Sequence, residues 1–200
     1  MSSQFLNLIK KRRTIYAIGK NVKQSPEELT ELIENAVEIS PSAFNSQTSR
    51  AVILFGKEHQ HYWDIVKEVL KPFAASEDAA QKTNAKIDSF AAGFGTVLFF
   101  EDQDVVENLQ NQFPLYADNF PVWSEHSTGI AQFSVWTALA EQGLGASLQH
   151  YNPLVDEKVH TKWKVPTSWK LRAQLVFGSI EAPAGEKEFM DRDHRFKVFK

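Results

Sequence analysis

Two short apolar runs constrain the fold of this 200-residue chain more than any other feature of its sequence. The first, Ala51 to Phe55, is closed by Gly56, and the second, Thr96 to Phe100, follows Gly93-Phe94-Gly95. Short apolar runs without alternation, bounded by glycine, are typical of strands that are covered on both faces of a sheet. The sequence therefore predicts a sheet with both of its faces buried.

Helical patterns lie between and around these runs. Ser25-Pro26-Glu27-Glu28 has the residues of a capping box and predicts a helix start; that helix leads into a loop beginning at Ser40. A second apolar stripe is expected to begin at Ser124, as its N-cap, and to end at Gly143. We also expect helices over 4–12, 59–70 and 155–163, helix or loop over 74–92, short pieces over 102–119, and strands over 145–148 and 171–178. With no internal repeat and no long linker, residues 1–200 are expected to form a single domain.

Composition excludes several classes of function. The chain has no cysteine, which excludes thiol catalysis, cysteine-ligated metals and a disulfide framework. Its net charge of −3 and pI near 6.1 argue against a nucleic acid or an anionic membrane as the main partner. No window approaches the ~20 apolar residues of a membrane span, and no signal peptide is recognisable. We therefore expect a cytoplasmic protein without nucleic-acid or membrane partners.

Motifs of side-chain catalysis are also missing from the sequence. His59, His61 and His126 lack the spacing of a metal site, and there is no Gly-x-Ser-x-Gly turn for a serine hydrolase. The pair Gly93-x-Gly95 precedes an apolar run where a dinucleotide fingerprint would follow one. The sequence predicts neither a bound metal nor a Rossmann domain.

Four polar stretches at the ends of predicted elements suit a phosphate-bearing aromatic cofactor. Arg12-Arg13-Thr14 and Arg195-Phe196-Lys197 offer cations for a phosphate, and arginine suits this role through its planar fork of donors. The loop from Ser40 to Gln47 offers amides and hydroxyls to a polar ring edge. The stretch Gly143 to His150 has small residues that would let the backbone approach a flat ring, and backbone N–H groups that could address ring nitrogens. Each stretch also has an ordinary reading: cations complementing a helix dipole, a loop of common loop formers, and a helix stop that leads into a strand.

In this order and spacing, the four stretches resemble the FMN-dependent nitroreductase family, in particular its small branch named after the fungal fatty-acid-repression mutant. The loop Gln149-His150-Tyr151-Asn152-Pro153 adds to that likeness. The resemblance implies an α+β fold of three α/β/α layers, with a mixed, mainly antiparallel sheet flanked by helices. It further implies an intertwined homodimer that holds FMN at the subunit interface, with the C-terminal segment crossing to the partner subunit.

Carried over residue by residue, the resemblance assigns each stretch a part of the cofactor. The phosphate and ribityl end would be bound by Arg12, Arg13 and Thr14, and the phosphate site would be completed by Arg195 and Lys197. The flavin would be contacted from the other subunit by Pro41, Ser42, Ala43, Asn45 and Gln47. At the ring would lie Leu148, Gln149 and His150, with a backbone N–H near N5. Tyr16 departs from the basic residue of many members, and residues 86–92 lack the Asn and Lys that larger members use.

The resemblance implies a ping-pong enzyme in which hydride passes from NADH or NADPH to flavin N5 and then to a nitroaromatic or quinone. The chemistry would belong to the cofactor, so no catalytic side chain is expected. Candidate walls of the acceptor pocket are Phe113, Tyr116, Phe120 and Trp123. Two other functions remain open: a flavin-binding stress-response or regulatory protein with incidental reductase activity, and an interaction protein without FMN.

Overall fold

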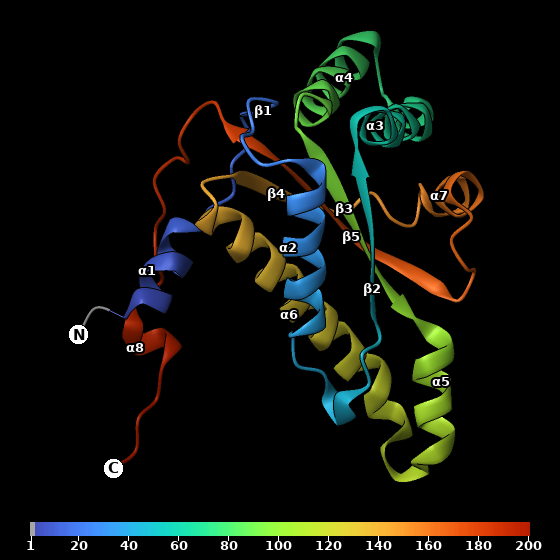
Figure 1. Cartoon of the computed structure of the whole chain (residues 1–200), viewed down its shortest axis with the longest axis vertical. Coiled ribbons are helices and arrows are strands. Elements are labelled where there is room, and N and C mark those ends of the chain that lie inside the picture. The colour runs from blue at the N-terminus through green and yellow to red at the C-terminus, as the bar shows by residue number, and fades with distance from the viewer. Residues whose placement is uncertain (1–2) are drawn as a thin grey trace.

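A sheet of five strands forms the middle layer of the molecule, which we describe for residues 3–200 from a computed structural model (Figure 1). The path β1-β5-β3-β2 orders the sheet, and β4, which lies off this path, also pairs with β5. The strands are β1 (Ile18–Gly19), β2 (Ser49–Phe55), β3 (Gly95–Asp102), β4 (Gly145–Gln149) and β5 (Trp169–Ile180). Every pair of these strands is antiparallel, and Thr14 adds a parallel bridge to Ala146. The expected mixed, mainly antiparallel sheet is confirmed.

Helices cover both faces of this sheet, which confirms the three-layer α+β architecture. Helices α2 and α6 pack on one face, and α3, α4 and α7 contribute to the core on the other (Figure 1). The helices are α1 (Gln4–Lys11), α2 (Pro26–Glu38), α3 (Gly56–Leu70), α4 (Glu77–Ala91), α5 (Gln103–Gln112), α6 (Phe120–Glu141), α7 (Asp156–Trp163) and α8 (Arg192–Arg195), with 3₁₀ turns η1 (Ala43–Asn45), η2 (Lys71–Phe73) and η3 (Pro114–Asn119). None of the helices within residues 3–200 has the length and apolarity needed to cross a bilayer.

Strand β3 explains why the apolar run from Thr96 to Phe100 has no alternation. Successive side chains of a strand point to opposite faces. Val97 and Phe99 enter the core under α2 and α6, whereas Leu98 and Phe100 enter the core under α3 and α4. All four side chains are fully buried, as expected for a strand between two helical layers.

The same expectation holds only in part for β2, which packs against both helical layers but is an edge strand. It pairs with β3 alone, and within it only Leu54 is buried, while the other residues are half-buried. An edge strand loses cover along one side even when helices lie over both of its faces. A continuous apolar pattern therefore identified the strand but not its place in the sheet.

Three helix predictions also need correction. Helix α6 begins at Phe120, with Pro121 in its first turn, so Ser124 is a buried residue inside the helix whose hydroxyl donates to Thr48 Oγ1 at 2.9 Å. The weakly patterned segment 74–92 forms the regular helix α4, capped by the Ser76 hydroxyl. Most of segment 102–112 is likewise regular, because Asp102 caps α5 and the helix ends before Pro114. The predicted stop at Gly143 is confirmed by its φ of +81°.

Candidate functional site

Arg12 follows α1 and lies over α6. Its guanidinium carbon is 4.3 Å from the centroid of the Trp136 ring, which is a cation–π distance. Its Nε atom is buried and has no hydrogen-bond partner among residues 3–200. Burial, followed by the charge of Arg13, lowers the pKa of Arg12. A part-buried cation with an unpaired donor fits an anionic group such as the predicted phosphate.

The structure brings the basic N-terminal stretch against the strand β4. Thr14 forms the parallel bridge to Ala146, and the Ile15 N–H donates to the Ala146 carbonyl at 3.0 Å. Arg13 Nη2 donates to the Gly185 carbonyl at 2.8 Å, which ties the start of the C-terminal tail to the same place. Two of the four predicted stretches therefore meet at this edge of the sheet.

The edge of β4 beyond this bridge presents backbone groups outward. Because the Ala146 carbonyl accepts from outside the β4–β5 pair, the N–H and C=O of Leu148, two residues on, also point away from β5. The Gln149 side chain donates to Ser147 Oγ at 2.6 Å, and His150 is exposed just after the strand. Leu148 thus offers the kind of outward N–H that a ring nitrogen can accept.

Gly145 is explained by a close approach within the chain. A Cβ at this position would lie 2.8 Å from Ile15 Cγ2 and 3.0 Å from Ile180 Cγ1. We expected the small residues of this stretch to let the backbone approach a flat ring. At Gly145 they instead make room for the N-terminal segment.

The loop from Ser40 to Gln47 lies along α6. The Ser40 hydroxyl is 2.8 Å from Ser134 Oγ, and a cavity of about 190 Å³ opens between the loop and the helix. The loop contributes Pro41, Ser42 and Ala43 to this cavity, and α6 contributes Trp123, His126, Ser127 and Ile130. Part of the predicted flavin loop therefore already lines a hollow.

Hydrogen bonds inside the loop use some of its polar groups. Ser42 Oγ accepts from the Gln47 N–H at 2.9 Å, and Gln47 Nε2 donates to the Asn45 carbonyl at 3.4 Å. The amide side chain of Asn45 makes no hydrogen bond within the described residues and is exposed. Ser42 and Gln47 shape the loop, while Asn45 keeps its donors and acceptor available.

Within one chain, the loop and the basic stretch are separated along α6. The loop cavity reaches Ile130, and Arg12 lies over Trp136, six residues further on. At 1.5 Å per residue this is about 9 Å along the helix. Among the described loop residues, only Ser40, at the start of the loop, hydrogen-bonds to α6 beyond the cavity, at Ser134. Arg195 and Lys197 lie in the exposed tail, which descends on the same side as α1 in Figure 1, and no interaction joins either residue to Arg12 among the described residues. The four stretches therefore do not converge within a single chain.

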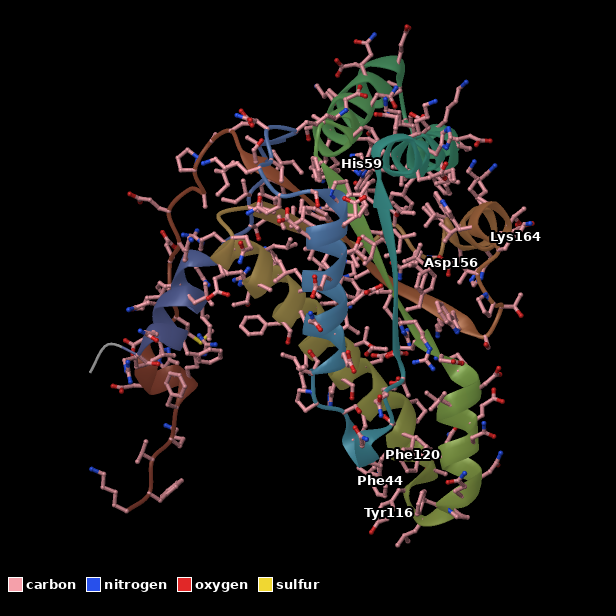
Figure 2. The ribbon with its side chains drawn as sticks, viewed as in Figure 1. Phe44, His59, Tyr116, Phe120, Asp156 and Lys164 are labelled. Atoms are coloured by element: carbon pink, nitrogen blue, oxygen red, sulfur yellow. The ribbon has the colours of Figure 1, made fainter. Side chains whose placement is uncertain are left out.

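The predicted pocket walls form an aromatic cluster, and Phe44, which we did not single out, is its centre. The Phe44 ring centroid is 5.1 Å from Phe113, 5.4 Å from Phe120, 6.1 Å from Tyr116 and 6.0 Å from Trp123. Figure 2 shows Phe44, Tyr116 and Phe120 together at one end of the molecule, next to η1 and η3. The one available signal was a lone aromatic residue in an otherwise polar loop.

A buried ion pair beneath α6 was also missed. Arg172 Nη2 lies 2.6 Å from Glu101 Oε2 and 2.8 Å from Glu125 Oε1, beside a polar cavity of about 230 Å³. Burial raises the pKa of Glu101, while the hydrogen bond from Arg172 opposes this. The signal was a charged residue, Glu101, that directly follows the apolar run Thr96 to Phe100. Residues 3–200 contain no group of three potential metal ligands.

Comparison with known proteins gives the class of the chain. Residues 9–179 match the model of the nitroreductase family, and the chain belongs to this family. Its members are oxidoreductases that bind flavin.

The chain is similar to individual members of the family over nearly its whole length. The nitroreductase CinD from Lactococcus lactis, solved with nicotinic acid, is 60% identical with a TM-score of 0.92, over 98% of this chain and 100% of that chain. CinD has also been solved with 4-nitrophenol and with chloramphenicol. The nitroreductase FRM2 of Saccharomyces cerevisiae is 36% identical over 192 residues, 95% of either chain. An FMN complex from Desulfovibrio desulfuricans, at 15% identity and a TM-score of 0.72 over the whole of both chains, shares the fold.

Proposed function

We propose that this protein is an FMN-dependent reductase that uses NADH or NADPH to reduce nitroaromatics and quinones in a ping-pong cycle. The observation that carries the proposal is that two unused groups lie at the β4 edge of the sheet. The buried Nε of Arg12 has no hydrogen-bond partner among the described residues, and the backbone N–H of Leu148 points outward from β4. One group fits a phosphate and the other fits a ring nitrogen. Bound FMN would accept hydride at N5 and pass it to the acceptor.

In this proposal the chain binds and orients both cofactor and substrates. Arg12, Arg13 and Thr14 hold the phosphate and ribityl end, and Leu148, Gln149 and His150 lie at the ring. The neighbouring subunit supplies the flavin loop and the tail cations: Pro41, Ser42, Ala43, Asn45 and Gln47, then Arg195 and Lys197. The Leu148 N–H stabilises charge that develops on the ring, so no side-chain acid, nucleophile or metal has a role.

A homodimer of 200-residue domains, each an FMN-binding unit, is part of the same proposal. Helix α6 is apolar around most of its circumference, yet Val122 is 51% and Ile130 41% exposed in one chain. A helix of this kind is normally buried on all sides. A second copy packed on α6 would cover these residues and bring its loop toward the basic stretch of the first copy.

The acceptor class rests on the aromatic cluster and on the relatives. Phe113, Tyr116, Phe120 and Trp123 present ring faces and edges suited to flat aromatic molecules. CinD binds 4-nitrophenol and chloramphenicol, which both carry nitroaromatic rings. We therefore propose nitroaromatics first and quinones, which are also flat, second.

The test is the absorbance spectrum and turnover of the purified protein. We expect a yellow dimer that oxidises NADH or NADPH when a nitroaromatic or quinone is present. A protein that stays colourless after incubation with FMN and shows no such oxidation would overturn the proposal. Stopped-flow reduction separates the regulatory alternative, because slow reduction by both nicotinamides at cellular concentrations would favour it. A monomer with full FMN occupancy would refute the role of Ser42, Asn45 and Gln47.

A further inference from the structure

We propose that Phe44 is a positioning residue that fixes the flavin loop by packing its ring into the aromatic cluster of Phe113, Tyr116, Phe120 and Trp123. The inference rests on the proposed function, because it takes Ser42 to Gln47 as the loop that contacts the cofactor. It adds that the aromatic residues proposed as walls of the acceptor pocket also hold in place the loop that is proposed to bind FMN.

The loop has a conformation that its sequence alone disfavours. Phe44, Asn45 and Gln47 have φ values of 58°, 50° and 48°, all in the left-handed region. Non-glycine residues adopt this region rarely; asparagine tolerates it best, and a bulky residue such as phenylalanine is the clearest outlier. Strain of this kind persists only where the surrounding structure holds it in place.

Hydrogen bonds tie the two ends of the loop to the rest of the molecule, through Ser40 to Ser134 Oγ and through the Gln47 carbonyl to Arg50 Nη1, but those at its tip are internal. The Asn45 N–H donates to the Ser42 carbonyl at 3.0 Å, and the Ser46 N–H donates to the Ala43 carbonyl at 3.1 Å. Together with the bond from the Gln47 N–H to Ser42 Oγ, these contacts lie within the loop itself. They cannot determine where the tip of the loop, at Phe44, stands relative to the first turns of α6.

The Phe44 ring makes that connection. It stacks on Trp123 of α6 at an interplanar angle of 18° and meets the Phe120 ring edge at 68°. It also contacts Phe113 and Tyr116, on either side of the start of η3. Contacts of this geometry add to the stabilisation that burial alone provides. Four rings from one neighbouring region thus hold the most strained residue of the loop.

The experiment measures FMN affinity by flavin fluorescence titration of apoprotein for the wild type and variants of Phe44. Phe44→Asn keeps a residue that tolerates the left-handed region but removes the ring. We expect it to bind FMN about tenfold more weakly or worse, a loss of the size that one or two ring contacts predict. Phe44→Tyr keeps the ring and should bind like the wild type.

Matched variants separate positioning from general damage. Phe73→Ala removes another exposed phenylalanine, in η2, and should leave FMN affinity unchanged. Phe113→Ala leaves the loop sequence intact but removes a contact of Phe44, so it should also weaken FMN binding. Thermal melting of each apoprotein identifies variants that fail to fold, and the flavin absorbance band of the complexes reports whether the ring environment has changed.

The outcomes distinguish the inference from the proposed function. If the wild type binds FMN and Phe44→Asn binds it equally well, Phe44 does not position the loop. Loss of affinity in Phe44→Tyr equal to that in Phe44→Asn would likewise overturn the inference. If the wild type itself does not bind FMN, it is the proposed function that fails.

Discussion

The two helical layers differ in how completely one chain covers them. On the α3 and α4 side, Trp63 Nε1 donates to Thr96 Oγ1 at 3.0 Å, and His59 contacts both Thr96 Oγ1 at 2.8 Å and the Ala91 carbonyl at 3.2 Å. On the α6 side, Trp136 Nε1 is buried without a partner in the described structure, and Ile130 is exposed. Helices α3, α4 and α7 carry no exposed large hydrophobic residue, whereas α1 and α6 do.

We infer from this difference that the α3 side mainly stabilises the fold and that the α6 side mainly binds other molecules. The α3 side has an apolar core in which Trp63 and His59 pair with Thr96, although the buried Tyr62 Oη has no partner within the described residues, and such a core is where substitutions disturb folding most. The α6 side holds Arg12, the β4 edge and the aromatic cluster, and its exposed apolar residues suit contact with another molecule. Four experiments test this division, from the largest expected effect to the smallest.

Replacing Trp63 by alanine should mainly lower stability, whereas replacing Trp136 by alanine should mainly weaken FMN binding. Trp63 is fully buried, so Trp63→Ala should lower the free energy of unfolding by about 4 kcal/mol, as for other large-to-small core changes. Trp136 is half-buried beneath Arg12, so Trp136→Ala should be less destabilising but should weaken FMN binding. Urea unfolding and FMN titration measure the two effects. Equal loss of stability in both variants would contradict the division between the layers.

Acid should weaken the α3 side through His59. Burial lowers the pKa of His59 to about 4, although the hydrogen bond to the Ala91 carbonyl opposes this shift. Because this pKa lies below the unfolded value near 6.5, the stabilisation is fully present above pH ~6.5 and is lost as pH falls toward 4. The difference corresponds to about 3 kcal/mol.

The matched variants for this prediction lie on the same helix. His59→Gln should flatten the dependence of unfolding free energy on pH between 6.5 and 4, relative to wild type. His61→Gln, at an exposed position of α3, should leave the curve unchanged. If His59→Gln and wild type lose the same stability over this range, protonation of His59 is not what weakens the fold.

Local chemistry made the elements of this fold predictable, and long-range packing decided the rest. The capping box formed as expected, because Ser25 and Glu28 satisfy each other's backbone N–H groups at 3.1 and 2.7 Å without help from distant residues. The edge position of β2 depends on which strands pair, and its own sequence carries no such information. The start of α6 was placed at Ser124 because a serine before an apolar stripe is a good cap, but Pro121 extends the first turn further back.

The residues of the candidate site also divide into those that local chemistry predicts and those that depend on long-range packing. Arg12 and Thr14 could be selected from their chemistry, and the structure places them beside Trp136 and Ala146. Phe44 could not be selected, because its left-handed backbone and its contacts depend on residues about 70 positions further along the chain. Sequence patterns report side-chain chemistry, but they do not report which distant rings will surround a residue.

The basic end of the α6 side should respond strongly to loss of one cation. We expect Arg12→Ala to weaken FMN binding about 100-fold, because charge-assisted hydrogen bonds contribute roughly 1.5–3 kcal/mol each. Lys11→Ala removes the neighbouring charge, whose Nζ lies 3.4 Å from the Glu141 carbonyl, and should have little effect. Fluorescence titration compares the two variants at the same ionic strength. Equal weakening would mean that overall charge, and not the buried guanidinium of Arg12, attracts the phosphate.

The smallest effect should come from the exposed apolar surface of α6, and it tests whether a second copy covers that surface. Ile130→Ser removes apolar area that the proposed dimer would bury, so we expect about tenfold weaker dimerisation. Phe73→Ser removes a more exposed apolar side chain beside α3, where the chain needs no partner, and should leave the dimer unchanged. Sedimentation over a range of protein concentrations gives both dissociation constants. Because the loop cavity ends about 9 Å from Arg12 along α6, FMN affinity should fall as the Ile130→Ser dimer dissociates on dilution. If FMN affinity stays constant while the dimer dissociates, one chain alone completes the site. The exposed apolar surface of α6 would then have no role in FMN binding.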